Sequence, residues 1–447
     1  MPADGIIGEY LATYDGKKEL RVEATMHVTS PRLEVEESAD AFLSDVEASP
    51  VGRDAWVKAK RDGHLFVLAP CAHEPCRLRY RVALRDAAKK IDELETASEE
   101  GEVIISPPSA WVLSPAREDD KAFVRFRVKT ENGTSFSTGV YRSPKAEGAW
   151  DISLADLWTA PYSAFGPLRT RTTKPKGAQV DLAFGPGKMA LSDDDVLAWT
   201  ETCERAIVGY YGQFPMREAL LIFIAGRGHT MGEGKTLGGG GGAIFLRVGE
   251  RATKESVAND WVLTHEMVHL TFPTLARQHH WAEEGVATYV EPFARARVGT
   301  LGVEEAWKGV VEGVPNGLPL ADDRGIDHTP TWGRTYWGGA LFFLLADVGY
   351  RRRTNNAQGL EHALRGINAA GGNNAVRWSI TDTFAAADKA VGVPVLAELY
   401  EAWADKAVTP DLPKLWRDLG VVYTNGKISF DDKAPDAAIR KAITTAN

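Results

Sequence analysis

Three kinds of feature are scarce in this sequence, and each scarcity argues against certain classes of protein. No apolar stretch approaches the roughly eighteen residues that a membrane-spanning helix needs, so no membrane span is expected. Positive charge is not in excess, and the net charge of −9 argues against nucleic acid and anionic membranes as main partners. The start, MPADGIIGEY, lacks a basic and hydrophobic signal region. The compartment stays open, and it would be extracytoplasmic if a leader had been trimmed.

Cysteine is also rare, with three residues in the chain. Cys71 and Cys76 flank Ala-His-Glu-Pro, and their spacing, with His73 inside, is not a recognised zinc arrangement. The pair fits either a disulfide that closes a hairpin in an oxidising compartment or two reduced, partly buried thiols. Cys203 lies in a helical pattern and is expected in the core.

What is present describes an ordinary globular protein. The chain has 447 residues, of which 44% are hydrophobic and 25% charged, enough for two or three domains and a large core. Residues 1–178 alternate apolar and polar side chains in several runs, as in Leu78, Tyr80 and Val82, which predicts a β-rich, sandwich-like N-terminal domain. After about residue 300 the pattern is mainly helical. We therefore expect an α+β protein with regions 1–178, 179–300 and 301–447.

The middle region, 179–300, begins with a helix and a pair of strands. Ser192 and Asp195 resemble a capping box that opens a helix ended by Gly212. Buried strands are expected at 219–225 and 243–248, separated by a glycine-rich loop over 226–242. A phosphate-loop interpretation of that loop is weak, because His229 stands where the full motif needs its first glycine.

The five residues 265–269 read HEMVH, an HExxH motif. On a helix, two histidines four positions apart project from one face, a geometry that suits two ligands of a catalytic Zn²⁺. Glu266 can reach the water that such a metal activates and take its proton. A helix starting near Ser256 or Asn259 and stopping before Pro273 would be apolar nearly all round. A metal would satisfy both buried rings, whereas two satisfied core histidines are the plainer alternative.

A third ligand is expected from a second helix-forming run, residues 281–291, ended by Pro292. Glu284 and Glu291 lie on one helical face, so one can bind metal while the other accepts the free N–H of a ligand histidine. Glu283 points about 100° away and is expected to face solvent or substrate. The rival ligands are His279 and His280.

This pair of motifs resembles the gluzincin metallopeptidases, the class that includes thermolysin and the alanyl and glycyl aminopeptidases. Their pattern is HExxH, a gap, and then W-x-x-E-G-x-A-x-Y-x-E, and every fixed position of the second part is met between Trp281 and Glu291. The resemblance implies a thermolysin-like catalytic domain with one Zn²⁺ per chain. It makes His265, His269 and Glu284 the metal ligands and leaves Glu291 to orient a histidine.

The resemblance also implies a transition-state donor and a substrate-binding edge. Thr335 to Leu341 resembles the aminopeptidase segment that carries a catalytic tyrosine, so Tyr336 is expected to stabilise the oxyanion, with His328 as the alternative. Related enzymes bind substrate through a glycine-rich segment whose Glu holds the α-amino group. Here Gly238–Gly242 keeps the glycines without that Glu. The expected substrate-binding residues are Gly240, Gly241, Gly242, Ala243 and Glu283.

The sequence therefore predicts a zinc metallopeptidase, aminopeptidase-like, that acts on a peptide or protein substrate. Three alternatives stay open: an endopeptidase without free-amine recognition, a zinc hydrolase of a non-peptide bond, and a non-catalytic binding protein on the same fold. Intact Glu266 argues against the last, because a purely structural zinc site has no use for a general base.

Overall fold

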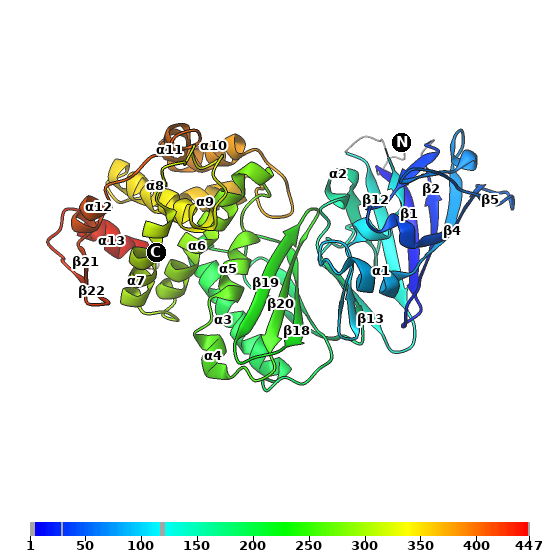
Figure 1. Ribbon diagram of the computed structural model, residues 1–447, viewed down its shortest axis with the longest axis horizontal. Helices are drawn as coiled ribbons and strands as arrows, with labels where there is room; N and C mark the ends of the chain where they lie inside the picture. Colours follow the sequence, from blue (N-terminus) through cyan, green and yellow to red (C-terminus); the bar gives the residue numbers. More distant parts are fainter. Residues whose placement is uncertain (1–4, 28–29, 117–120, 446–447) are drawn as a thin grey trace.

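The computed structural model describes residues 5–27, 30–116 and 121–445. Residues 1–4, which belong to the N-terminal stretch that lacks a signal region, lie outside these ranges. Figure 1 shows a β-rich N-terminal part in blue and cyan, a green sheet in the middle, and helices beyond it in yellow to red. This is the α+β order expected from the sequence. None of the helices in the described ranges has the length and apolarity needed to cross a membrane.

The N-terminal part contains three sheets that share one core. The seven-stranded sheet has the order β14-β12-β1-β2-β8-β4-β5, and two four-stranded sheets have the orders β13-β15-β10-β9 and β11-β3-β7-β6. Buried side chains of all three sheets meet, including Tyr10, Ile104 and Phe66, so the sheets pack as a sandwich-like unit. The strands are β1 (Ile6–Tyr14), β2 (Leu20–Met26), β3 (Arg32–Glu34), β4 (Leu43–Pro50), β5 (Val57–Lys58), β6 (Lys60–Asp62), β7 (Leu65–Val67), β8 (Cys76–Val82), β9 (Ser98–Glu100), β10 (Val103–Ile105), β11 (Ser114–Pro115), β12 (Phe123–Thr130), β13 (Ser135–Thr138), β14 (Trp150–Ser153) and β15 (Ser163–Gly166).

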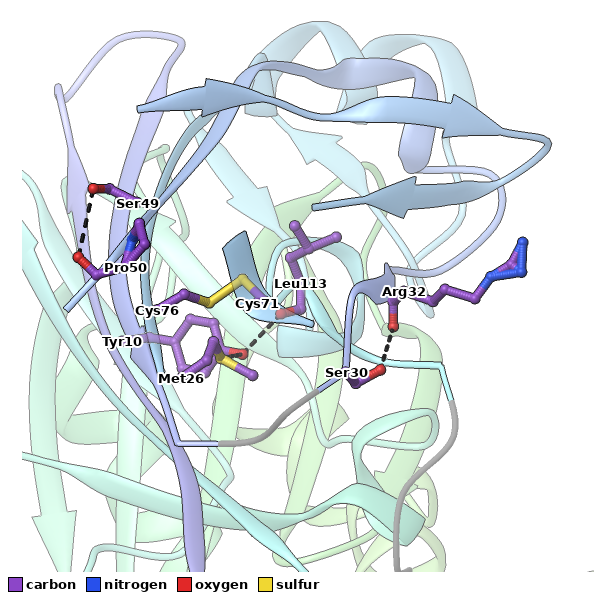
Figure 2. Close-up of a disulfide and its surroundings, with 9 residues drawn as sticks. All are labelled: Tyr10, Met26, Ser30, Arg32, Ser49, Pro50, Cys71, Cys76 and Leu113. Atoms are coloured by element: carbon purple, nitrogen blue, oxygen red, sulfur yellow. Dashed lines mark hydrogen bonds between the residues drawn. A yellow bond between two sulfur atoms is a disulfide. The ribbon is translucent and has the colours of Figure 1, made fainter. Parts of the chain in front are cut away.

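Cys71 and Cys76 form a disulfide, which resolves the alternative that the sequence left open. Figure 2 shows it beside the buried Tyr10, whose hydroxyl donates to the carbonyl oxygen of Leu113 at 2.7 Å. Both cysteines are buried, and Cys76 begins β8 in the middle of the large sheet. The bridge thus ties the connection before β8 to the sandwich core. Cys203 is free and buried, as expected.

The middle sheet has five strands in the order β16-β17-β18-β20-β19, namely β16 (Arg169–Thr173), β17 (Gln179–Phe184), β18 (Glu218–Gly226), β20 (Gly242–Gly249) and β19 (Met231–Gly238). Strands β17, β18 and β20 are parallel, and the two edge strands are antiparallel to their neighbours. One face packs on helices through residues such as Leu221 and Phe223. The other face packs on the N-terminal part through Leu220, Ile222 and Phe245. The parallel strands are buried on both faces, which explains their continuous apolar sequences.

The helices of the chain lie mostly after this sheet. They are α1 (Leu84–Ile91), α2 (Leu154–Leu157), α3 (Asp193–Tyr211), α4 (Lys254–Ala258), α5 (Val262–His269), α6 (His280–Arg297), α7 (Val303–Gly313), α8 (Gly339–Arg353), α9 (Leu360–Ala369), α10 (Ile380–Val391), α11 (Val395–Trp403), α12 (Leu412–Leu419) and α13 (Ala437–Thr444). Short 3₁₀ turns are η1 (Asp40–Phe42), η2 (Ala69–Cys71), η3 (Pro108–Ala110), η4 (Arg277–His279) and η5 (Val314–Gly317), and η6 (Arg334–Gly338) is a π-turn that leads into α8. A small hairpin, β21 (Val421–Thr424) and β22 (Lys427–Phe430), follows α12.

Several local predictions are confirmed. Helix α3 opens on the Ser192–Asp195 capping box and closes on Gly212 in the left-handed conformation. Strands β18 and β20 match the two expected buried strands to within one residue.

Four local predictions were wrong. The glycine-rich segment expected to be a loop contains the edge strand β19, because pairing with β20 outweighs the low strand propensity of glycine. The metal-site helix does not begin at Ser256 or Asn259: a short α4 with a Thr253 cap comes first, and Val262 then donates to the Asp260 carboxylate at the start of α5.

The other two errors concern boundaries. Helix α6 continues past Pro292 to Arg297, because Phe293 and Ala294 are buried in the core and their packing offsets the hydrogen bond that proline cannot make. The expected junction at residue 178 falls inside the middle sheet, since β16 precedes it and pairs with β17.

Candidate metal centre

The two histidines of the HExxH motif lie side by side on α5. This helix is apolar on its remaining faces, with Leu263, Met267 and Val268 fully buried, so it runs through the core beneath the middle sheet. Burial extends to the imidazoles, whose side chains are 6% and 14% exposed at His265 and His269. The ring centroids are 4.9 Å apart. Two buried rings at this distance favour a shared ligand over separate hydrogen-bond partners.

Glu284 completes a triangle with the histidines. It comes from α6, which returns beside α5 after the connecting turn. Its Oε2 lies 3.3 Å from Nε2 of His265 and 3.5 Å from Nε2 of His269. Tetrahedral coordination with bonds of about 2.0–2.1 Å separates ligand atoms by about 3.3–3.4 Å. The distances from the Glu284 oxygen to the two imidazole nitrogens are therefore close to those between ligands of one zinc ion.

Glu266 is the second carboxylate within reach of this site. One of its ligand atoms lies within 4.8 Å of atoms of both histidines, so distance alone would allow it to bind metal. Its Oε2, however, accepts a 2.6 Å hydrogen bond from the Thr236 hydroxyl, which also donates to the Glu266 carbonyl oxygen at 3.1 Å. The contact to β19 holds Glu266 toward the cleft, where a general base belongs. The geometry thus favours Glu284 over Glu266 as the carboxylate that could bind a metal beside the two histidines.

Glu291 does not have the contact that the sequence predicted. Its Oε1 accepts from Nη1 of Arg295 at 2.7 Å, one turn further along α6, and no hydrogen bond with a ligand histidine is found among the described residues. Burial raises the pKa of Glu291, while the charges of Arg295 and His265 lower it. The direct partner of this carboxylate is therefore an arginine that the sequence did not indicate.

Glu283 lies in the cleft with both oxygens engaged. Oε1 accepts from the backbone N–H of Leu275 at 3.0 Å, and Oε2 lies 3.1 Å from Nδ1 of His280. The other ring nitrogen of His280 lies 3.3 Å from Oε1 of Glu284. Glu283 and His280 thus form a hydrogen-bonded pair beside the carboxylate of Glu284. Each oxygen of Glu283 already has a protein partner, so the expected contact of Glu283 with substrate is less favoured.

The remaining histidine candidates lie elsewhere. Nδ1 of His279 lies 3.0 Å from a carboxylate oxygen of Asp327, and that oxygen also accepts from the Trp281 indole. His328 is half-exposed and pairs with Asp405 at 2.6 Å. Neither lines the cleft that contains the metal triangle.

Tyr336 does line that cleft. Burial, and then the negative charges of Glu284 and Glu266, raise the pKa of Tyr336 to about 12, so its hydroxyl remains a proton donor. The π-turn that carries it sits where α6 and α8 cross. A Cβ added to Gly339 would lie 2.3 Å from the carbonyl oxygen of Trp281 and 2.7 Å from Cα of Gly285. The glycine that follows Glu284 therefore allows the close helix contact that brings Tyr336 near the ligands.

The cleft has a volume of about 670 Å³, and the edge strand β19 forms one of its sides. Small side chains alternate along this strand: Gly234 and Thr236 face Glu266, and Gly238 faces Asn374. A Cβ on Gly234 would lie 2.9 Å from Cγ of Glu266. The two-residue period lets the strand lie directly against the metal-site helix.

The expected substrate-binding residues Gly240, Gly241, Gly242 and Ala243 are not part of the cleft lining. Gly240 donates to the carbonyl oxygen of Ala375 and accepts from the N–H of Tyr141, and Gly242 donates to Gly139. Their backbone groups are already paired with the N-terminal part and with a later loop. This prediction was wrong because Gly240 and Gly241 lie in the turn after β19 and Gly242 and Ala243 begin β20, whereas the cleft is lined by β19 itself.

Several residues that line the cleft were not predicted from the sequence. They are Glu95, Thr159, Tyr162, Trp261, Thr236, Thr274 and Asn374. The first three come from the N-terminal part, far from the motif in sequence. Only Thr236 had a usable signal, the period-two spacing of Gly234, Thr236 and Gly238.

No protein-family model matches the chain, and no curated protein matches its sequence. Its fold does match solved structures. An aminopeptidase N family protein from Idiomarina loihiensis superposes with a TM-score of 0.67 and 13% identity, over 93% of this chain and 78% of that one.

An M1 zinc metallopeptidase variant from Deinococcus radiodurans, solved with a Tyr-Ser-Ala substrate, gives a TM-score of 0.57 and 15% identity over 91% of this chain and 94% of that one. A two-domain M1 zinc metallopeptidase variant bound to L-arginine gives 0.56 and 14%, with the same coverage. The chain therefore has the fold of the M1 zinc metallopeptidases, in agreement with the gluzincin resemblance of its motifs. At this identity the likeness concerns the fold.

Proposed function

We propose that this protein is a zinc-dependent, aminopeptidase-like peptidase with one Zn²⁺ held by His265, His269 and Glu284. The observation that carries the proposal is the triangle of ligand atoms, whose separations of 3.3 and 3.5 Å fit tetrahedral zinc. Three protein ligands leave a fourth position open, as catalytic zinc sites do. The shared fold with M1 zinc metallopeptidases supports the same conclusion.

Zinc in this site would polarise the scissile carbonyl and make water a stronger nucleophile near neutral pH. Glu266, oriented by the Thr236 hydroxyl, takes the proton of the attacking water and passes it to the leaving amine. Tyr336 stays protonated at neutral pH and donates a hydrogen bond to the oxyanion. Each step thus has a residue of suitable chemistry in the cleft.

A peptide is the substrate that the cleft fits best. Strand β19 is the last strand of its sheet, so the backbone on its free edge can pair with an extended chain by strand addition. The small residues on its side toward α5 let the strand lie against that helix, so its free edge runs along the cleft beside Glu266. One protein of the same fold was solved with a tripeptide substrate. These features favour a peptide over a compact ester or phosphate.

The first experiment measures zinc content and hydrolysis of a set of unblocked peptides. We expect about one zinc per chain, activity that disappears with a chelator, and recovery on adding zinc. His265→Ala should reduce both metal content and activity. Metal that binds without any peptide hydrolysis would contradict the peptidase assignment, and ester hydrolysis in the same preparation would move it to a non-peptide hydrolase.

Glu266→Gln tests the general base. We expect the variant to retain zinc and to lose most of its turnover, with substrate binding affected less, because an amide cannot take the proton of water. Glu255→Gln, the same replacement at an exposed position of α4, should behave like the parent. Hydrolysis at the parental rate by the Glu266 variant would contradict the assigned role.

A further inference from the structure

Trp261 gives the cleft an exposed apolar surface. The residue lines the cleft and is 52% exposed, whereas Tyr162, another aromatic residue of the lining, is 1% exposed. Leu237 and Val262 line the cleft too, but they are partly buried, so Trp261 is the exposed large hydrophobic residue among the described residues of the lining. Single exposed apolar residues are common on protein surfaces, but an indole inside a cavity offers a contact surface to whatever enters that cavity.

The indole lies one helical turn before His265. The N–H of His265 donates to the carbonyl oxygen of Trp261 at 3.0 Å, so Trp261 belongs to the first turn of α5. The indole and imidazole rings meet edge to face, with centroids 5.2 Å apart and planes at 87°. An extended peptide advances about 3.4 Å per residue. A peptide whose scissile carbonyl lies beside His265 would therefore have a neighbouring side chain within reach of the indole.

Contacts beside Trp261 fix its position. The Asp260 carboxylate accepts from the N–H of Val262 at 2.8 Å. Cγ1 of Val262 would lie 2.7 Å from a Cβ on Gly234, so the start of α5 is packed against β19. The indole N–H itself makes no hydrogen bond within the described residues. Trp261 is thus held at a defined place while part of its surface and its donor stay unused, as a recognition group requires.

The charged side chains next to Gly234 are paired with one another. The Lys235 ammonium lies 3.3 Å from Oε1 of Glu233 and 3.7 Å from Oε1 of Glu95. The other oxygen of Glu233 accepts from Nη1 of Arg247 at 3.0 Å. These pairs leave little net charge to attract a charged substrate side chain to this part of the cleft. An uncharged apolar side chain gains by covering the indole and loses no hydration of a charge.

We propose that Trp261 is a specificity-determining residue, whose indole packs against a large apolar or aromatic side chain of the substrate residue next to the scissile bond. The inference rests on the proposed peptidase function and adds the class of peptide, one with phenylalanine, leucine or a similar residue at that position. Val262, partly buried in the same lining, extends the apolar surface.

The test uses two series of unblocked tetrapeptides, one varied at the first residue and one at the second, with alanine, leucine, phenylalanine or lysine at the varied position. In one series the parent should cleave the leucine and phenylalanine peptides about 10- to 100-fold better in kcat/KM than the alanine peptide, the range for apolar discrimination in a pocket. Trp261→Ala should reduce this ratio to about threefold or less. Trp261→Phe should keep most of it, because an aromatic surface remains.

Trp158→Ala is the matched control. Trp158 is also exposed, at 43%, but it is not part of the cleft lining. Its neighbour Thr159 lies at the other end of β19, where a Cβ on Gly239 would be 2.6 Å from the Thr159 hydroxyl oxygen. The Trp158 variant should keep both the rates and the preference of the parent.

Zinc content separates recognition of substrate from support of the His265 ring. Trp261→Ala should retain about one zinc per chain, because the three proposed ligands are unchanged. A variant that loses zinc, or whose activity falls equally on every peptide, would show a structural role and contradict the inference. A parent that prefers the lysine peptides, or that shows no preference in either series, would overturn the inference and leave the peptidase function standing.

Binding separates the two proposals further. In the Glu266→Gln background, calorimetry should show tighter binding of the phenylalanine peptide than of the alanine peptide, and Trp261→Ala should abolish the difference. Discrimination in binding without hydrolysis by the parent would contradict the proposed function and support the inference. Equal binding of the two peptides in the Glu266→Gln background would contradict the inference.

Discussion

Two glutamates face the same pair of imidazoles, and their surroundings give them different roles. Burial alone would raise the pKa of Glu284, but the charges of His269 and His265 hold it well below its usual range. Such a carboxylate stays ionised and is suited to bind a metal. Glu266 instead receives the Thr236 hydroxyl and faces the edge strand. The sequence identified both residues, but the hydroxyl that orients Glu266 is visible only in the fold.

Tyr336→Phe should slow turnover by about 10- to 1000-fold, the effect of losing one oxyanion donor. Because the pKa of Tyr336 is raised to about 12, the hydroxyl is protonated over pH 6–9 and the ratio of parent to variant rates should be constant there. Steady-state rates at three pH values provide the measurement. His328→Ala, which alters a surface ion pair with Asp405, serves as the control and should keep the parental rate.

At the scale of elements, the crossing of α6 and α8 determines where Tyr336 lies. Gly339→Ala would introduce a Cβ 2.3 Å from the Trp281 carbonyl oxygen, so the helices must separate. We expect a loss of about 1–3 kcal/mol in the free energy of unfolding. Turnover should also fall, because Tyr336 moves with α8, whereas zinc content should be retained because the ligands lie on α5 and α6.

The control for this substitution is Gly309→Ala in α7, where an added Cβ meets nothing within 4 Å. It should be neutral or stabilise by up to about 1 kcal/mol, since alanine favours the helix. Denaturation of both variants and the parent tests the pair. Equal stability and activity of the Gly339 variant would show that the crossing tolerates more separation than the contacts indicate.

Glu204 on helix α3 makes the stability of the protein depend on pH. Burial raises the pKa of Glu204 to about 7, despite a hydrogen bond from Thr173. The folded state therefore keeps this proton while the unfolded chain releases it, so the contribution of Glu204 to stability declines as pH rises from about 4.5 through 7. Glu204→Gln should stabilise the protein at pH 8 by on the order of 1–3 kcal/mol and have little effect at pH 4.5. The difference in melting temperature between variant and parent at both pH values is the measurement, and an equal difference at the two values would contradict it.

The sequence predicted the features that depend on neighbouring residues and missed those that depend on tertiary packing. The HExxH helix, the Ser192 capping box and the strands β18 and β20 follow from short patterns, and the structure contains them. Strand β19 was not predicted, because its glycine-rich sequence is typical of a loop and only pairing with β20 makes it a strand. Asn374 and Tyr162 could not be found at all, because only tertiary packing brings them to the cleft.

At the scale of the molecule, the middle sheet is covered on both faces by different parts of the chain. Leu220, Ile222 and Phe245 pack against Val103, Tyr162 and other residues of the N-terminal part. The N-terminal part also supplies one wall of the cleft through Glu95, Thr159 and Tyr162. It is therefore a structural component of the cleft and not an independent attachment.

A fragment that begins at Leu168 keeps the whole five-stranded sheet and every proposed metal ligand but loses this cover. Exposing side chains such as Leu220, Ile222, Ile224 and Phe245 costs about 1.5–3 kcal/mol each, a sum comparable to the roughly 5–15 kcal/mol of a whole domain. We expect the fragment to aggregate or to lack fixed tertiary packing, as size-exclusion chromatography and near-ultraviolet circular dichroism would show. A soluble fragment with a cooperative unfolding transition and bound zinc would mean that the sheet does not need its N-terminal cover.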